Sequence, residues 1–178
     1  MGERKNNLSG LDESDIDLRS DQLFESLKQY GFKFVTGVPD SVFAGFVACA
    51  RRDEEITYVP AAREEEAVGI AAGAYFGGMR SAVHMENAGL GNSINALLSL
   101  ILLYRIPVLL VISWRGEGEI DTPEHHIQGA HTLNILNELG IPSKVLTEEN
   151  HREALGSLID AMNQNTPVAL LIKKGLLS

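Results

Sequence analysis

Six short apolar segments alternate with segments of helical character along most of this chain. This alternation constrains the fold most, because strands that are separated by helices pair in parallel. Residues 108–112 read Val-Leu-Leu-Val-Ile and are apolar at every position, which is typical of a strand buried on both faces. The other segments expected to be strands are 32–36, 56–59, 81–85, 143–146 and 168–172. The sequence therefore predicts an α/β fold: a doubly wound, six-stranded parallel sheet with helices on both faces.

The loops at the carboxyl ends of parallel strands share one edge of the sheet, and ligands bind at that edge. The loops expected there follow Thr36, Val59, Met85 and Ile112. Gly89-Leu90-Gly91 is predicted to be a loop that precedes a helix over 92–104, and residues 115–128 are predicted to be a long polar loop. We expect a ligand site on this rim.

Length and charge exclude several classes of partner. The 178 residues suit one domain that buries roughly 70% of its unfolded surface. Residues 1–18 are expected to be a polar leader and residues 19–178 the domain. The 15 Lys and Arg against 24 Asp and Glu give a net charge of −9, which repels nucleic-acid phosphates and anionic lipid. Nucleic acid and membrane surfaces are therefore not expected as partners.

The most apolar stretch and the single cysteine indicate where in the cell the protein is expected. Residues 94–113 are interrupted by Arg105 and Pro107, so they are expected to be a buried helix and a strand rather than a membrane span. Cys49 has no second cysteine with which to form an intrachain disulfide, which fits a reducing compartment. We expect a cytoplasmic protein.

Two patterns allow both a structural and a functional interpretation. Gly89-Leu90-Gly91 suggests dinucleotide binding, but Ile94 stands where that pattern needs Gly or Ala, so a tight turn with positive φ is favoured. Residues 64–66 are three glutamates at the start of a helix, where the helix dipole stabilises acidic residues. A carboxylate partly desolvated on the rim would have a raised pKa, and composition does not choose which of the three it is.

His125 and His126 are adjacent, which is a poor arrangement for chelating a metal on one helix face. Neither cysteines nor spaced carboxylates support a zinc site, so no metal site is expected in this chain. The two imidazoles are either polar filler in a loop or groups that move protons near pH 7.

Four segments, taken together and in this order, resemble thiamine-diphosphate-dependent 2-oxoacid decarboxylases. The segments are residues 58–75, 87–95, 113–117 and 125–129. They are similar to the pyrimidine-binding (PYR) domain of that family. The resemblance is strongest to the subgroup that acts on sulfopyruvate or phosphonopyruvate, above all to sulfopyruvate decarboxylase alpha subunits.

The resemblance implies that one glutamate activates the cofactor through a hydrogen bond with its aminopyrimidine ring. The spacing to Ala67 and Gly73 assigns this role to Glu64, and a shift of one residue would assign it to Glu65. His125 and His126 would handle the protons of the reaction. The residues expected to line the cofactor are Pro39, Asn87, Gly89, Leu90, Gly91 and Asn92, and those expected at the substrate are Arg115 and Gln128.

One family motif is missing. The diphosphate-binding (PP) domain of the family holds a divalent metal with a Gly-Asp-Gly sequence, and this chain contains none. The resemblance therefore implies the PYR (alpha) subunit of a split enzyme, whose PP-domain (beta) subunit holds Mg²⁺ with thiamine diphosphate. The expected reaction converts 3-sulfopyruvate to sulfoacetaldehyde and CO2.

Two alternatives remain beside this interpretation. In the first, the chemistry is the same and the substrate is phosphonopyruvate or another 3-substituted pyruvate. In the second, the chain is a non-catalytic PYR-like interaction subunit. A homodimer within the heteromer is expected to form through the Ala/Gly-rich helix over 64–78, because small residues let paired elements approach closely.

Overall fold

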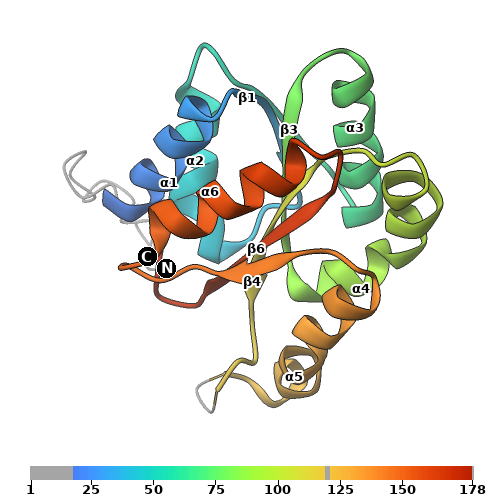
Figure 1. Ribbon diagram of the computed structural model, residues 1–178. Coiled ribbons are helices and arrows are strands. Elements are labelled where there is room, and N and C mark those ends of the chain that lie inside the picture. The colour runs from blue at the N-terminus through green and yellow to red at the C-terminus, as the bar shows by residue number, and fades with distance from the viewer. Residues whose placement is uncertain (1–17, 119–120, 178) are drawn as a thin grey trace, which may run out of the picture.

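The computed structural model describes residues 18–118 and 121–177, and its centre is one six-stranded, all-parallel sheet (Figure 1). The strand order is β2-β1-β3-β4-β6-β5. The strands are β1 (Phe32–Gly37), β2 (Thr57–Pro60), β3 (Arg80–Glu86), β4 (Leu109–Trp114), β5 (Ser143–Val145) and β6 (Val168–Lys173). Every neighbouring pair is parallel, which confirms the predicted fold class.

Helices cover both faces of the sheet. One face carries α1 (Leu18–Gln29), α2 (Ala44–Arg52) and α6 (His151–Met162), and the other carries α3 (Glu64–Phe76), α4 (Asn87–Ala96) and α5 (Pro123–Glu138) (Figure 1). Strand β4 alternates between the two cores: Leu109 and Val111 pack on the α1 side, and Leu110 and Ile112 pack on the α3 side. This alternation explains why the strand is apolar at every position.

A crevice is expected between β1 and β3, because the chain leaves these neighbouring strands toward opposite faces. After β1, the short helix η2 (Ser41–Phe43) leads into α2 on one face, whereas α4 follows β3 directly on the other. Such a point of divergence at the carboxyl ends of strands is where doubly wound folds bind ligands.

The prediction of a loop at Gly89-Leu90-Gly91 is wrong. Helix α4 begins at Asn87, immediately after β3, and the π-helix η3 (Leu97–Leu102) continues it. Neither Gly89 nor Gly91 has a positive φ, so the predicted tight turn is wrong as well. The glycine at position 89 is instead required by a close approach to α3.

The predicted long loop over 115–128 is also too long. Helix α5 begins at Pro123, whose fixed φ suits a first helical position, so His125, His126 and Gln128 lie on a helix. The predicted leader lies outside the described residues except for Leu18, which begins α1. Among the helices of the described ranges, none combines the length and the apolarity needed to cross a membrane.

Candidate active site

An open crevice of about 310 Å³ lies where the turns after β1, β2, β3 and β4 meet. Its lining residues are Val38, Pro39, Asp40, Ser41, Glu64, Glu86 and Arg115. Three of the expected site residues, Pro39, Glu64 and Arg115, are therefore brought together from three separate connections. The crevice contains three carboxylates and one guanidinium, so its wall is predominantly acidic.

Glu64 is the first residue of α3, and its side chain lies against α4. A Cβ atom at Gly89 would lie 2.2 Å from Cγ and 2.9 Å from Oε1 of Glu64, so only glycine leaves room for this side chain. The Asn92 amide donates a hydrogen bond to Glu64 Oε2 at 3.3 Å. The carboxylate is thus half-buried and held at the edge of the crevice by two residues of α4.

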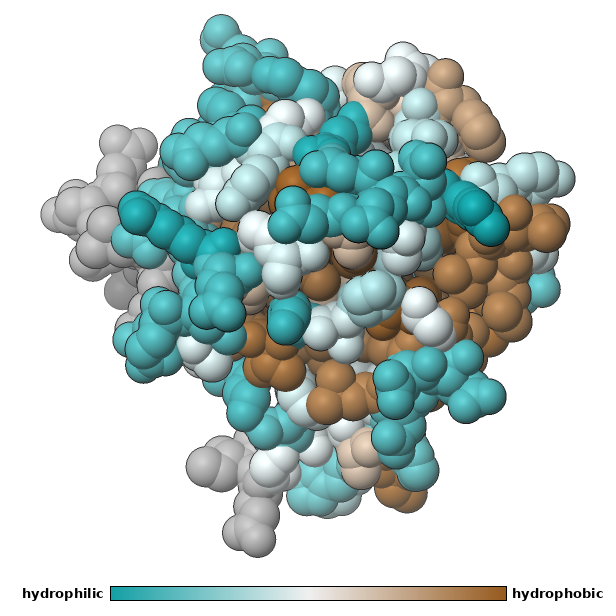
Figure 2. Space-filling view, in the orientation of Figure 1, coloured by the Kyte–Doolittle hydropathy of each residue, from teal (hydrophilic) through white to brown (hydrophobic). Residues whose placement is uncertain are grey.

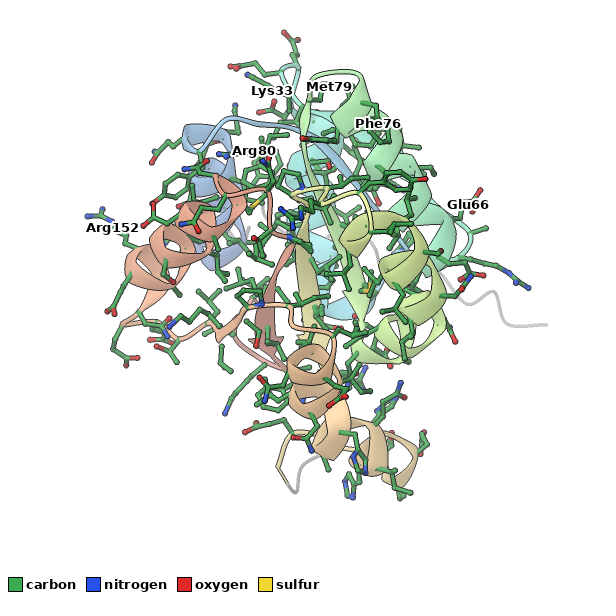
Figure 3. The ribbon with its side chains drawn as sticks, turned by 45° about the vertical axis from the view of Figure 1, so that its right-hand side comes forward. Lys33, Glu66, Phe76, Met79, Arg80 and Arg152 are labelled. Carbon is green, nitrogen blue, oxygen red and sulfur yellow. The ribbon has the colours of Figure 1, made fainter. Side chains whose placement is uncertain are left out.

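The other two glutamates of the triplet have different partners. Arg63 lies 3.4 Å from Glu65 Oε1, and Glu66 Oε2 accepts a hydrogen bond from the Ala62 backbone N–H at 3.0 Å. Glu66 lies in the first turn of α3, at the opposite end of the helix from Phe76, and its side chain is exposed (Figure 3). Of the three glutamates, Glu64 alone lines the crevice.

Asp40 is a crevice residue that the sequence reasoning missed. Its Oδ1 accepts a hydrogen bond from the Val42 backbone N–H at 2.9 Å and so caps η2, and its Oδ2 accepts one from the Ser113 hydroxyl. The signal was present in the sequence, because an Asp directly after Pro39 is a strong N-cap candidate. These two hydrogen bonds fix the orientation of the Asp40 carboxylate in the wall of the crevice.

A second acidic residue outside the prediction, Asp121, organises the wall beside the crevice. The Nε and Nη2 atoms of Arg115 donate to its two carboxylate oxygens at 2.8 and 2.9 Å. His125 Nδ1 lies 3.1 Å from Oδ1 of the same carboxylate, whose side chain is 3% exposed. The Arg115 guanidinium, with help from His125, holds the pKa of Asp121 well below its usual range, and Asp121 in turn raises the pKa of Arg115.

The two histidines differ in environment. His125 is partly buried, and its Nε2 lies 3.6 Å from Oε1 of Glu86, which lines the crevice. His126 is exposed, and its Nε2 lies 3.0 Å from the backbone oxygen of Asp121. The structure therefore connects His125 to the crevice through Glu86, whereas His126 lies on the outer side of α5.

Asn87 connects three elements behind the crevice. Its side-chain amide donates to the Arg115 carbonyl and to Thr132 Oγ1, both at 2.9 Å, and Gln128 donates to the Asn87 carbonyl at 3.2 Å. The Asn87 side chain is fully committed to these contacts, since the residue is only 2% exposed. Leu90 is completely buried in the core on the α3 side. These two residues shape the wall by packing and hydrogen bonding within the protein.

Comparison with known proteins identifies the family of this chain. Residues 19–136 match the model described as "Thiamine pyrophosphate enzyme, N-terminal TPP binding domain", where thiamine pyrophosphate is another name for thiamine diphosphate. Sulfopyruvate decarboxylase subunit alpha of Methanococcus maripaludis is 35% identical over 157 residues, which cover 86% of this chain and 93% of that protein. Phosphonopyruvate decarboxylase of Streptomyces viridochromogenes is 31% identical over 160 residues, or 88% of this chain and 40% of that protein.

Solved structures support the fold. Benzoylformate decarboxylase from Polynucleobacter necessarius superposes with a TM-score of 0.66 at 19% identity, over 86% of this chain and 29% of that one. At this identity the likeness concerns the fold alone. The family model and the relative from Methanococcus maripaludis show more than the fold: this chain belongs to the thiamine-diphosphate enzymes and carries their N-terminal cofactor-binding domain.

Proposed function

We propose that this chain is the alpha subunit of a thiamine-diphosphate-dependent decarboxylase that converts 3-sulfopyruvate to sulfoacetaldehyde and CO2. The sulfopyruvate decarboxylase alpha subunit of Methanococcus maripaludis supports this, since it matches the chain over nearly its full length. The observation that carries the proposal is the position of Glu64, which lines the crevice and is packed on a glycine of α4. The single cysteine supports a cytoplasmic location.

The crevice fits the pyrimidine ring of thiamine diphosphate but not the diphosphate. A pyrimidine ring needs a carboxylate for its ring nitrogen and close access to it, and Glu64 beside the side-chain-free Gly89 offers both. A diphosphate would instead face Asp40, Glu64 and Glu86, with a single cation, Arg115, that is already bound to Asp121. We therefore assign the diphosphate and its Mg²⁺ to a second, PP-domain subunit.

When bound, thiamine diphosphate supplies the electron sink for the loss of CO2. The role proposed for this chain is to place and exchange protons. Glu64 would share a proton with the pyrimidine nitrogen, and His125, beside Glu86, would act as an acid–base group toward the substrate. His126, the second proposed acid–base group, would have to act from the outer side of α5. Arg115 and Gln128 are proposed to contact the substrate. The residues proposed to surround the cofactor are Pro39, Asn87, Gly89, Leu90, Gly91 and Asn92, with Asn87 and Leu90 acting through packing.

The outer surface of α3 and η3 is the proposed contact with a second copy of this chain. Phe76, Leu103 and Tyr104 are all more than 60% exposed, and the space-filling view shows an apolar region on this side of the molecule (Figure 2). Gly69 and Gly73 are also exposed, and a Cβ atom at either would meet no neighbour within 4 Å. Helix glycines without local contacts lower helix stability, which favours a partner that uses the space.

The function is tested by reconstitution with a candidate PP-domain subunit. The mixture is assayed for CO2 release from 3-sulfopyruvate and from phosphonopyruvate, with each subunit alone as the control. We expect turnover of 3-sulfopyruvate only by the mixture. Turnover of phosphonopyruvate alone would transfer the assignment to that substrate, and turnover of neither would refute the proposed function.

Glu64→Gln in the same assay separates a catalytic from an interaction subunit. The substitution is nearly isosteric, so assembly should persist while decarboxylation falls strongly. Glu66→Gln is the matched control, because Glu66 bonds to the backbone outside the crevice. If the mixture with Glu64→Gln turned over as fast as the wild type, Glu65→Gln would be assayed next, and wild-type rates in both variants would identify a non-catalytic interaction subunit.

A further inference from the structure

A second open pocket, of about 510 Å³, lies on the same rim beyond the Arg115–Asp121 pair. Its lining residues are Trp114, Gly116, Glu117, Gly118, Asp121, Lys173 and Lys174. Asp121 belongs to its wall, and Arg115, bound to Asp121, belongs to the wall of the crevice, so the two hollows adjoin at this ion pair. The pocket is built by the ends of two neighbouring strands, since Trp114 of β4 pairs in register with Lys173 of β6.

Two side chains of this pocket are fixed by their surroundings. The Trp114 indole N–H donates to the Gly129 carbonyl at 2.9 Å, which sets the orientation of the ring. The Lys173 ammonium lies 5.9 Å from the centre of that ring and 2.7 Å from Glu117 Oε1. Lys173 is therefore held by a carboxylate and an aromatic face, and its charge is largely balanced by Glu117.

Lys174 is the cation in this pocket with free donors. Its closest carboxylate among the described residues is Asp121, at 3.9 Å, which is beyond hydrogen-bond distance. Asp121 already accepts hydrogen bonds from the Arg115 side chain and from the backbone N–H groups of Gly116 and Thr122. No described residue accepts a hydrogen bond from the Lys174 ammonium, so its donors can meet a ligand.

The charged side chains that line the pocket are two lysines and two carboxylates, and of the two lysines only Lys174 has no carboxylate within hydrogen-bond distance among the described residues. The chain as a whole is strongly acidic, and so is the neighbouring crevice. With as many cations as carboxylates in its described lining, this pocket is better suited to a small anion than the crevice is.

We propose that Lys174, with Lys173 beside it, binds the tetrahedral anion on carbon 3 of the substrate and so determines substrate specificity. The inference rests on the proposed function and deepens it. This anion is a sulfonate in 3-sulfopyruvate, the proposed substrate, and a phosphonate in the alternative substrate, phosphonopyruvate. Hydrogen bonds between an ammonium and an ionised oxygen are among the stronger ones that proteins make, so Lys174 would favour a substrate with an anion on carbon 3 over one without it.

The first test uses the isolated full chain, because its only tryptophan, Trp114, lies in the wall of the pocket. Tryptophan fluorescence is followed during titration with sulfoacetate, phosphonoacetate or acetate at constant ionic strength. We expect a saturable change with sulfoacetate and none with acetate. In Lys174→Gln the dissociation constant should rise about 10-fold or more. Lys144→Gln, which changes an exposed lysine of β5, should bind as the wild type does.

Each other outcome of this titration counts against the inference. No saturable change in the wild type, or equal binding by Lys174→Gln and the wild type, would overturn the assignment of the pocket. Tighter binding of phosphonoacetate than of sulfoacetate would overturn the assignment to a sulfonate.

The second test uses the complex with the PP-domain subunit and separates this inference from the proposed function. Lys174→Gln should raise KM for 3-sulfopyruvate about 10-fold with little change in kcat, because the lysine binds an end of the substrate that does not react. An unchanged KM would overturn the inference. Wild-type complex without decarboxylase activity would refute the proposed function instead, and the fluorescence titration would still decide whether the pocket binds the anion.

Discussion

Gly89→Ala is expected to abolish most of the activity while leaving the fold intact. The added Cβ would lie 2.2 Å from Glu64 Cγ, whereas carbon atoms in contact are separated by about 3.5 Å or more, so the Glu64 side chain has to recede by roughly 1.3 Å. The same movement breaks the 3.3 Å hydrogen bond from Asn92. A displacement of this size at a reacting group costs about 100-fold in rate.

The free energy of unfolding of Gly89→Ala should change little or increase. Alanine is favoured over glycine in a helix by about 1 kcal/mol, which offsets the cost of turning one flexible side chain. The matched control is Gly156→Ala in α6, where the closest neighbour of the new Cβ, the Tyr30 hydroxyl, is 3.7 Å away. The control should gain stability of the same order and keep full activity.

The assay compares decarboxylation by the reconstituted complex with thermal unfolding of each variant. Gly89→Ala should lose about 100-fold in kcat with a Tm within a few degrees of the wild type. If Gly89→Ala kept the wild-type rate, Glu64 would not be the residue that activates the cofactor. A variant that unfolded would show instead that the α3–α4 contact is needed for the fold.

Three further predictions concern the remaining titratable residues. His125→Ala should slow turnover by about 10²–10⁴-fold without loss of assembly, and His126→Ala should slow it less, because its ring lies on the outer side of α5; normal kcat values in both would make the pair surface filler. Burial lowers the pKa of His84 from 6.5 to about 4, so the unfolded chain binds more protons, and stability should fall by about 3 kcal/mol between pH 6.5 and pH 4. His84→Phe should flatten that loss in urea unfolding at pH 7 and pH 5, and an unchanged pH dependence would contradict the assignment. Asp121→Asn should weaken the Arg115 contact and lower the Tm of the isolated chain, which a thermal melt can check, while an unchanged Tm would show that the pair adds no stability.

The sequence was sufficient to predict the sheet, because its signal is local. Runs such as 108–112 are apolar at every position, and the helices between such runs leave only parallel pairing. The start of α4 was not predictable in the same way. Gly-Leu-Gly normally indicates a loop, and here it is helical because Glu64 of α3 occupies the space beside Gly89.

Only part of the candidate site could be predicted from the sequence, for the same reason. Residues of the rim that lie in recognisable segments, such as Glu64 and Arg115, could be named. Lys174 could not, because it comes near Asp121 only through the pairing of β4 with β6, which no short segment encodes. The proximity of two residues that follow neighbouring strands can be predicted only when the strand order is known.

The parallel sheet also has a consequence for the speed of folding. The β4–β6 pair joins Leu109 to Val168, and its strands are connected through α5, β5 and α6. No described pair of neighbouring strands can form as a hairpin, so the chain must close long loops before the first pairing is stabilised. Refolding from denaturant should therefore be slow, and the apolar β4 segment stays exposed to self-association until β6 arrives.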